Sequence, residues 1–158
     1  MSLQLIAYFR DQLVKFIDEI IEQFPDKPDF VLVKLIVKDK VSMTDVMGRY
    51  IQTVIPEKDV IVNRNLDFFK KDFVKGYEDW PNLNRIFLEV KSLYFSDRLD
   101  DDERDTIWKW MELFLRICEK YYIKYGPIEG WEIKEKDKSK PFVKEILDKR
   151  EEFVRQNS

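Results

Sequence analysis

The 158-residue chain contains no histidine, one cysteine and only four glycines. Without histidine, it cannot form a Ser-His-Asp or Cys-His catalytic site, and it lacks the usual general base at neutral pH. Because Cys118 is alone, it excludes an intramolecular disulfide and a cysteine-based zinc site. The glycines match neither GxGxxG nor GxxxxGK[ST], the common phosphate-binding patterns. The sequence therefore predicts no cofactor.

Long uncharged segments are also missing. The uncharged run at the start covers residues 1–9, whereas a membrane-spanning helix needs about 20 apolar residues. The stretch MSLQLIAYFRDQLVKF has no basic region before it and no small-residue cleavage site after it, so we do not expect a signal peptide. The net charge of −3 gives the whole chain no attraction to nucleic acid or to an anionic membrane. We expect an intracellular protein without a membrane span.

Core-forming residues are abundant, since 44% of the chain is hydrophobic and 15% aromatic. Apolar residues recur every three or four positions in several segments, a spacing typical of amphipathic helices. These segments are residues 2–24, 42–55, 81–94, 102–125 and the stretch that begins near 141. Ser42, three residues before Asp45, predicts a capped helix start. The sequence predicts an all-α single domain over residues 1–158, a bundle of five to seven helices.

Two segments leave the local structure open. Residues 30–38, FVLVKLIVK, are rich in β-branched side chains and fit a buried strand. Pro28 suits a helix start equally well, and we expect a helix because few other segments offer a strand partner. Gly126 and Pro127 end the preceding helix, so residues 126–140 are predicted to be a loop or mobile segment.

The segment 102–125 is predicted to lie at the centre of the bundle. Its apolar residues cover most of the helix circumference, which requires other helices to cover it on several sides. Trp108 and Trp110 point in nearly opposite directions because residues two apart on a helix do not share a face. Tyr121, Tyr122 and Tyr125 lie beside lysines, a combination that can stack on single-stranded nucleic acid, but their helical spacing favours core packing.

Residues 65–80, NLDFFKKDFVKGYEDW, interleave aromatic residues with lysines. The span carries a charge of −1, which argues against a phosphate-binding surface. Phe69, Phe73, Tyr77 and Trp80 recur at intervals of four, four and three, which places them on one face of a short helix. They are our candidate partner-binding residues.

Two patterns point to a metal-dependent alternative. Asp100, Asp101 and Asp102 lie in an acidic run, and hard cations prefer several carboxylate ligands. The competing interpretation is that one of these aspartates caps the following helix. Pro25-Asp26 with Glu89-Val90-Lys91 or Glu132-Ile133-Lys134 matches the letters of a PD-(D/E)xK nuclease, but no central sheet is predicted, and we favour a chance match.

A partial resemblance covers about residues 5–75. FIDEIIEQFPD at 16–26 and VIPEKDVIVNRNLDFFKKDF at 54–73 are similar to uncharacterised small proteins of large nucleocytoplasmic DNA viruses. The matching positions include Tyr50, Pro56 and Phe68, whereas Glu57 stands where those proteins have an aromatic residue. The resemblance implies a mainly helical protein of the infected cell or the virion and supplies no reaction.

We therefore expect a non-enzymatic interaction protein, or a structural protein associated with a virion, that binds a protein partner through an apolar or aromatic surface. Two alternatives stay open: a nucleic-acid-binding accessory factor of viral replication or transcription, and an enzyme that holds a metal with carboxylates. The sequence fixes neither the partner nor the oligomeric state, and a homo-oligomer is compatible with it.

Overall fold

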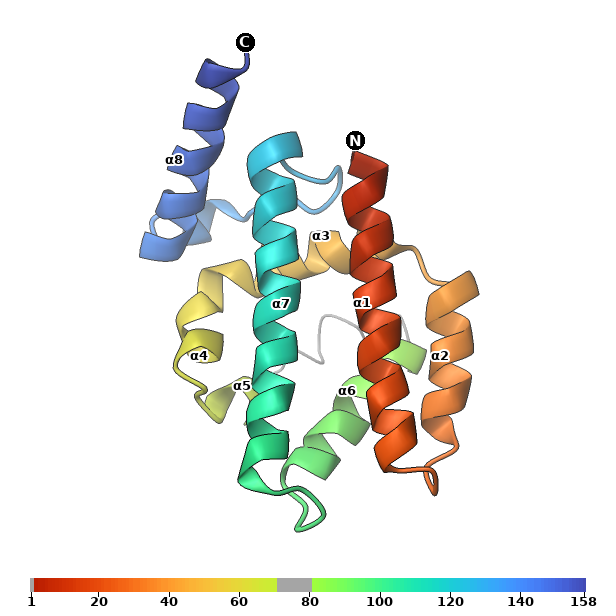
Figure 1. The fold of residues 1–158 in the computed structure, drawn as a ribbon. Helices are drawn as coiled ribbons and strands as arrows, with labels where there is room; N and C mark the ends of the chain where they lie inside the picture. Colours follow the sequence, from red (N-terminus) through yellow and green to blue (C-terminus); the bar gives the residue numbers. More distant parts are fainter. Residues whose placement is uncertain (1, 71–80) are drawn as a thin grey trace.

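The protein is an all-α single domain (Figure 1). The structure is a computed structural model that describes the backbone of residues 2–70 and 81–158 and the side chains of residues 2–68 and 88–158. The helices are α1 Ser2–Gln23, α2 Asp29–Asp39, α3 Met43–Thr53, η1 Ile55–Glu57, α4 Lys58–Val62, α5 Asp67–Lys70, α6 Pro81–Tyr94, α7 Asp101–Tyr125, η3 Glu135–Asp137 and α8 Pro141–Gln156. The described backbone contains no strand, and none of its helices is long and apolar enough to cross a membrane.

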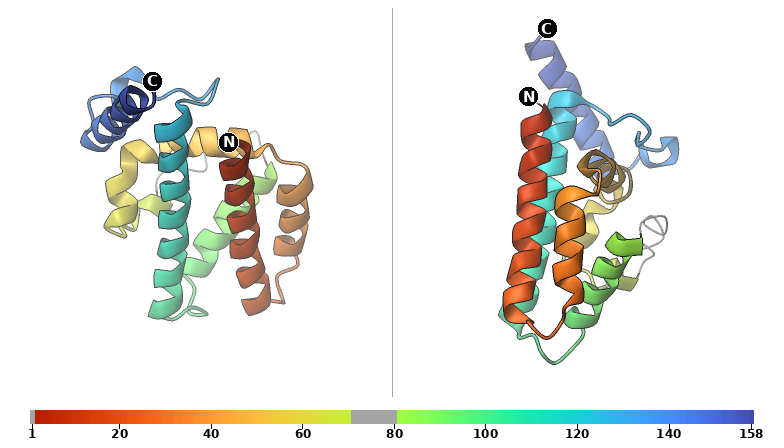
Figure 2. Two further views of the ribbon diagram at one scale, coloured as in Figure 1. Left: turned by 45° about the horizontal axis from the view of Figure 1, so that its top comes forward. Right: turned by 90° about the vertical axis from the view of Figure 1, so that its right-hand side faces the viewer.

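Helix α7 is the centre of the bundle, as its sequence predicts. It contacts α1, α3, α4 and α8. Helices α1 and α7 run side by side in opposite directions, α2 packs on the other side of α1, and α6 crosses behind them (Figures 1 and 2). Helix α8 packs on α7 and then extends away from the rest of the bundle (Figure 2).

The helix starts follow the capping signals in the sequence. Asp100 accepts a hydrogen bond from the backbone N–H of Glu103 at 2.8 Å, and the Glu103 side chain accepts one from the Asp100 N–H at 3.1 Å. This reciprocal capping box begins α7. The Ser42 hydroxyl likewise accepts from the Asp45 N–H at the start of α3. Residues 30–38 lie within α2, so the helix prediction for this segment is confirmed.

Aromatic rings pack together where α1 meets α7. The Phe114 ring of α7 lies 5.4 Å from the Phe9 ring and 6.0 Å from the Phe16 ring of α1, measured between centroids. The buried Tyr50 hydroxyl of α3 donates to the Met111 carbonyl at 2.9 Å. These contacts fix three helices around one aromatic cluster, and they leave the polar Tyr50 hydroxyl satisfied inside the core.

Residues 126–140 form a loop that contains the single turn η3. Its Ile128 and Ile133 side chains are buried. The Trp131 side chain rests on Gly48 of α3 and donates a hydrogen bond to Asp45 at 3.0 Å. The loop is therefore attached to the bundle by side chains at both its apolar and its polar positions.

Arg64 joins the end of α4 to α7. Its backbone has a φ of 50°, a left-handed conformation that non-glycine residues seldom adopt. The guanidinium donates to Asp105 and to Glu112, each at 2.8 Å. The hydrogen bond from Arg64, and then the one from Lys109, lowers the pKa of the Asp105 carboxyl.

The Asp105 ion pair predicts a loss of stability in acid. Because the folded state lowers this pKa, the unfolded chain takes up a proton first, and the contribution present at neutral pH is lost as the pH falls below about 4. In Asp105→Asn, the free energy of unfolding should therefore fall less between neutral and acidic pH. Urea unfolding at a series of pH values measures this. Arg64→Met should flatten the same acid limb, and an unchanged slope in both variants would contradict the assignment.

Candidate binding pocket

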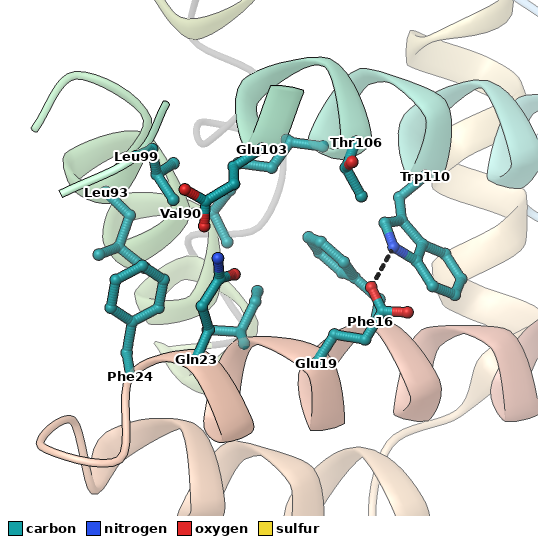
Figure 3. A pocket seen from close by; sticks show the side chains of 12 residues that line it. Phe16, Glu19, Gln23, Phe24, Val90, Leu93, Leu99, Glu103, Thr106 and Trp110 are labelled. Carbon is teal, nitrogen blue, oxygen red and sulfur yellow. Dashed lines mark hydrogen bonds between the residues drawn. The ribbon is translucent and has the colours of Figure 1, made fainter. Parts of the chain in front are cut away.

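A pocket of about 170 Å³ opens between α1, α6 and α7 (Figure 3). Its lining residues are Phe16, Glu19, Ile20, Gln23, Phe24, Val90, Leu93, Leu99, Glu103, Thr106, Ile107 and Trp110. Helices α1 and α7 form opposite walls, and α6 closes the inner end (Figure 3). The pocket therefore depends on segments that are about 80 residues apart in the sequence.

The inner surface of the pocket is apolar. Phe16, Ile20 and Phe24 follow one another at four-residue intervals and so share one face of α1 and of the turn that follows it. They are buried, as are Val90 and Leu93 of α6. This spacing is the same signal that predicts an amphipathic helix. Here part of the apolar face lines a cavity, although Phe16 also packs on Phe114 of α7.

The mouth carries two carboxylates, one from each wall. Glu19 of α1 accepts a hydrogen bond from the Trp110 indole N–H of α7 at 2.9 Å (Figure 3). Glu103 lies further toward the start of α7, where the capping box fixes one of its oxygens on the Asp100 N–H. Both carboxylates are thus held in place before any ligand arrives, which lowers the entropy cost of binding.

The charge of the lining is negative. It contains Glu19 and Glu103, the polar side chains of Gln23 and Thr106, and neither lysine nor arginine. Arg98, which is not a lining residue, has its guanidinium carbon 4.6 Å from the centroid of the Phe24 ring. Its two terminal nitrogens donate to the two carboxylate oxygens of Asp26, at 3.0 and 2.8 Å.

The Arg98 hydrogen bonds are the main cause that lowers the pKa of Asp26. Arg98 is therefore engaged outside the pocket, and the two glutamates at the mouth have no cationic counterpart among the lining residues.

The size of the pocket limits what it can hold. A cavity of about 150 Å³ accommodates a benzene-sized molecule, whereas pockets for drug-sized ligands and cofactors measure about 300–1,000 Å³. At about 170 Å³ this pocket matches one amino-acid side chain or a ligand of similar size.

The partner-binding residues proposed from the sequence are not placed by the structure. Phe73, Tyr77 and Trp80 lie outside the described residues, and so does the side chain of Phe69. Their neighbour Phe68 is buried, with its ring centroid 5.7 Å from that of Trp108.

The three aspartates considered as metal ligands lie at the start of α7. Asp100 is the cap, Asp101 pairs with Arg104 at 3.4 Å, and the Asp102 carbonyl accepts from Thr106. The capping interpretation is confirmed for Asp100. Within residues 2–70 and 81–158, no group of three or more His, Cys, Asp or Glu residues could hold a metal ion.

The matches to a nuclease motif are also engaged elsewhere. Asp26 binds Arg98, and Glu89 of α6 forms an ion pair with Lys27 at 3.3 Å. Glu132 lies in the loop before η3. Because α6 is a helix, the first triplet is not on the strand that such an active site requires.

Two further chemical candidates lie in the core. Cys118 is fully buried, and this burial raises the pKa of its thiol well above the ordinary value, so the thiolate nucleophile is disfavoured. Tyr121 and Tyr122 are buried as well, which confirms core packing for these two residues. The third tyrosine of the pattern, Tyr125, is 37% exposed, so core packing is not confirmed for it.

The pocket itself was not predicted from the sequence. Glu19 and Trp110 are 91 positions apart, and nothing in the local pattern of α1 or α7 indicates that they meet. The signal in the sequence was the apolar face of residues 2–24, which predicts an amphipathic helix but does not indicate a cavity.

Comparisons with protein-family models, with curated proteins and with solved structures each found no significant match. The function is therefore inferred from the geometry and charge of the pocket.

Proposed function

We propose that this protein is a non-enzymatic binding module whose pocket between α1, α6 and α7 receives a basic side chain, lysine or arginine, of a protein partner. The observation that carries the proposal is the pairing of an apolar interior with two carboxylates and no lining cation. A ligand that matches both features has an aliphatic stem and a positive head.

The aromatic residues add to this preference. The Trp110 and Phe16 rings lie 5.6 Å apart at one side of the pocket. A cation over an aromatic face gains about 0.5–2 kcal/mol, depending on how far it is desolvated. Lysine and arginine bury their methylene stems against apolar surface and keep the charged head toward water, which corresponds to an apolar floor beneath a carboxylate mouth.

A protein is the preferred source of the ligand because the pocket accommodates about one side chain. A single anchor in a small, preformed pocket is the usual form of an interface hot spot, and arginine is among the residues enriched there. The proposed role is binding, because the Glu19 and Glu103 carboxylates already accept hydrogen bonds from Trp110 and from the Asp100 N–H, and the lining includes no histidine, cysteine or lysine.

The resemblance of residues 5–75 to viral proteins is consistent with such a role and suggests where the protein partner comes from. In that setting the partner is a protein of the infected cell or of the virion, and the basic side chain belongs to it. The prediction of an intracellular location stays part of this proposal.

Side-chain recognition can be tested with three capped tripeptides, Gly-Arg-Gly, Gly-Lys-Gly and Gly-norleucine-Gly. We expect the two basic peptides to shift the Trp110 indole N–H resonance, with affinities on the order of millimolar because the ligands are small. The norleucine peptide should bind clearly more weakly. Higher salt should reduce this difference, because the glutamates at the mouth face water.

Matched variants separate the pocket from the general surface charge. Glu19→Gln should weaken binding of the basic peptides about two- to fivefold, as expected for an exposed ion pair, and Glu103→Gln should weaken it at least as much. Glutamine at position 103 can preserve the capping box. Glu22→Gln and Asp102→Asn remove the same charges from the same helices outside the pocket and should have little effect. Equal binding of the norleucine peptide would overturn the proposal.

A further inference from the structure

A second surface of opposite charge lies between α7 and α8. It is a groove of about 300 Å³ lined by Arg116, Glu119, Lys120, Ile123, Lys124 and Phe153. It shares no residue with the α1–α6–α7 pocket. Binding at this groove can therefore be tested separately from binding at the pocket, and neither result depends on the other.

The groove forms because the last residues of α8 extend beyond the point where α8 is attached to α7. Arg150 donates to the carbonyls of Ile123 and Lys124, at 3.0 and 2.8 Å, and so binds α8 to the last turn of α7. Before this point, Val143 and Ile146 of α8 are buried. Beyond it, Phe153 is only half-buried.

Val154 lies on the same apolar stripe as Val143 and is 44% exposed. The apolar face of α8 therefore continues beyond the domain's own core.

A line of cations borders this apolar surface. Arg116, Lys120 and Lys124 follow at four-residue intervals on one face of α7, over about 12 Å of helix. All three are exposed, and none of them forms an ion pair within the described part of the chain. The one carboxylate of the lining, Glu119, is paired with Lys58 at 3.1 Å.

We propose that the α7–α8 groove binds an acidic amphipathic helix of a partner protein. Carboxylates at four-residue intervals on such a helix repeat every turn, about 6 Å apart, and so match the spacing of Arg116, Lys120 and Lys124. Apolar residues beside them cover Ile123 and Phe153. This is the helix-in-groove mode of recognition, with charge complementarity setting the orientation.

The features of the groove favour this occupant over other anions. A single phosphate or fatty-acid carboxylate meets one cation and leaves the other two unpaired. A polynucleotide presents repeated charges, but Phe153 is the single aromatic residue among the lining residues on which a base could stack, and Ile123 offers no stacking surface.

The test uses a designed helical peptide of about 18 residues, with three glutamates at four-residue intervals and leucines beside them. Its control peptide carries glutamine in place of each glutamate. Fluorescence anisotropy should show the glutamate peptide binding about tenfold or more tightly than the glutamine peptide at low salt, with a smaller ratio at high salt. Phe153→Ser should weaken the binding of both peptides.

Two triple variants provide the matched comparison. R116Q/K120Q/K124Q should reduce the affinity for the glutamate peptide to that for the glutamine peptide. K15Q/K38Q/K40Q removes the same charge from exposed positions on α1 and the end of α2 and should leave binding unchanged. Circular dichroism checks that both variants fold.

Three outcomes would overturn the proposal: no binding of the glutamate peptide, equal binding of both peptides, or tighter binding of a single-stranded oligonucleotide that competes for the same site. The last outcome would assign the groove to phosphate recognition and would favour the nucleic-acid alternative.

Discussion

Replacing Trp108 with alanine should lower the free energy of unfolding by about 3–5 kcal/mol, the usual range for removing a buried tryptophan. The side chain is 2% exposed. Its indole N–H donates to the Tyr94 hydroxyl at 2.9 Å, and the Phe68 ring packs against it. One side chain thus connects α7 to α6 and to the start of α5. Thermal or urea unfolding followed by circular dichroism measures the loss.

Trp110 supplies a matched control two residues away. It lies on the opposite side of α7, is only partly buried, and lines the pocket. Trp110→Ala should cost at least about 1 kcal/mol less than Trp108→Ala, because it returns less apolar area to water. Equal losses would mean that the two indoles do not differ in burial as the structure indicates.

Tyr94→Phe tests the hydrogen bond between the Trp108 indole and the Tyr94 hydroxyl. It removes the acceptor of the Trp108 N–H while keeping the ring, and should cost about 1–3 kcal/mol if no other acceptor replaces it. Combined with Trp108→Phe, it forms a double-mutant cycle whose coupling energy reports the contact itself.

Gly48→Ala should destabilise the protein by about 2 kcal/mol, although alanine favours a helix over glycine. A Cβ at position 48 would lie 2.4 Å from Cδ1 and 2.7 Å from Cβ of Trp131. Trp131 cannot rotate out of this contact without moving its own backbone. It would also lose its hydrogen bond to Asp45 and its contact with Arg49, whose guanidinium lies 4.5 Å from the ring centroid.

The sign of this effect should reverse when Trp131 is absent. In a Trp131→Gly background the Cδ1, Cγ and Cβ atoms that would meet the new side chain are all absent, so Gly48→Ala should stabilise α3 by up to about 1 kcal/mol through helix propensity alone. Urea unfolding of the four proteins completes the cycle. If Gly48→Ala has the same effect in both backgrounds, the loop does not pack on α3 in the way described.

Much of the fold could be predicted because its signals are local. Amphipathic spacing predicted α1 and α7. Ser42 predicted where α3 begins, and the three aspartates at 100–102 indicated a cap near the start of α7 without showing which of them it is. These features depend on neighbours within one or two turns. The short helix α4, Lys58–Val62, was missed, since five residues are too few to show a period.

The candidate sites could not be predicted in this way, because they combine residues from distant segments of the chain. The residues chosen from the sequence, Phe69 to Trp80, were selected because aromatic residues cluster along the chain. The pocket instead combines Glu19 with Glu103 and Trp110, and the groove combines α7 with the overhanging end of α8. Neither arrangement has a signature within a single segment.

By itself, the sequence determined the all-α class, the central helix and the absence of histidine-dependent chemistry, because composition and helical period act over a few residues. The tertiary structure decided where apolar faces are left uncovered and which charges meet beside them. Glu19 and Trp110 are neighbours only because α1 and α7 pack side by side in opposite directions. Phe153 lines a groove only because α8 continues beyond its contact with α7. Such features depend on how helices of particular lengths pack against one another, and a sequence pattern within one segment does not predict this.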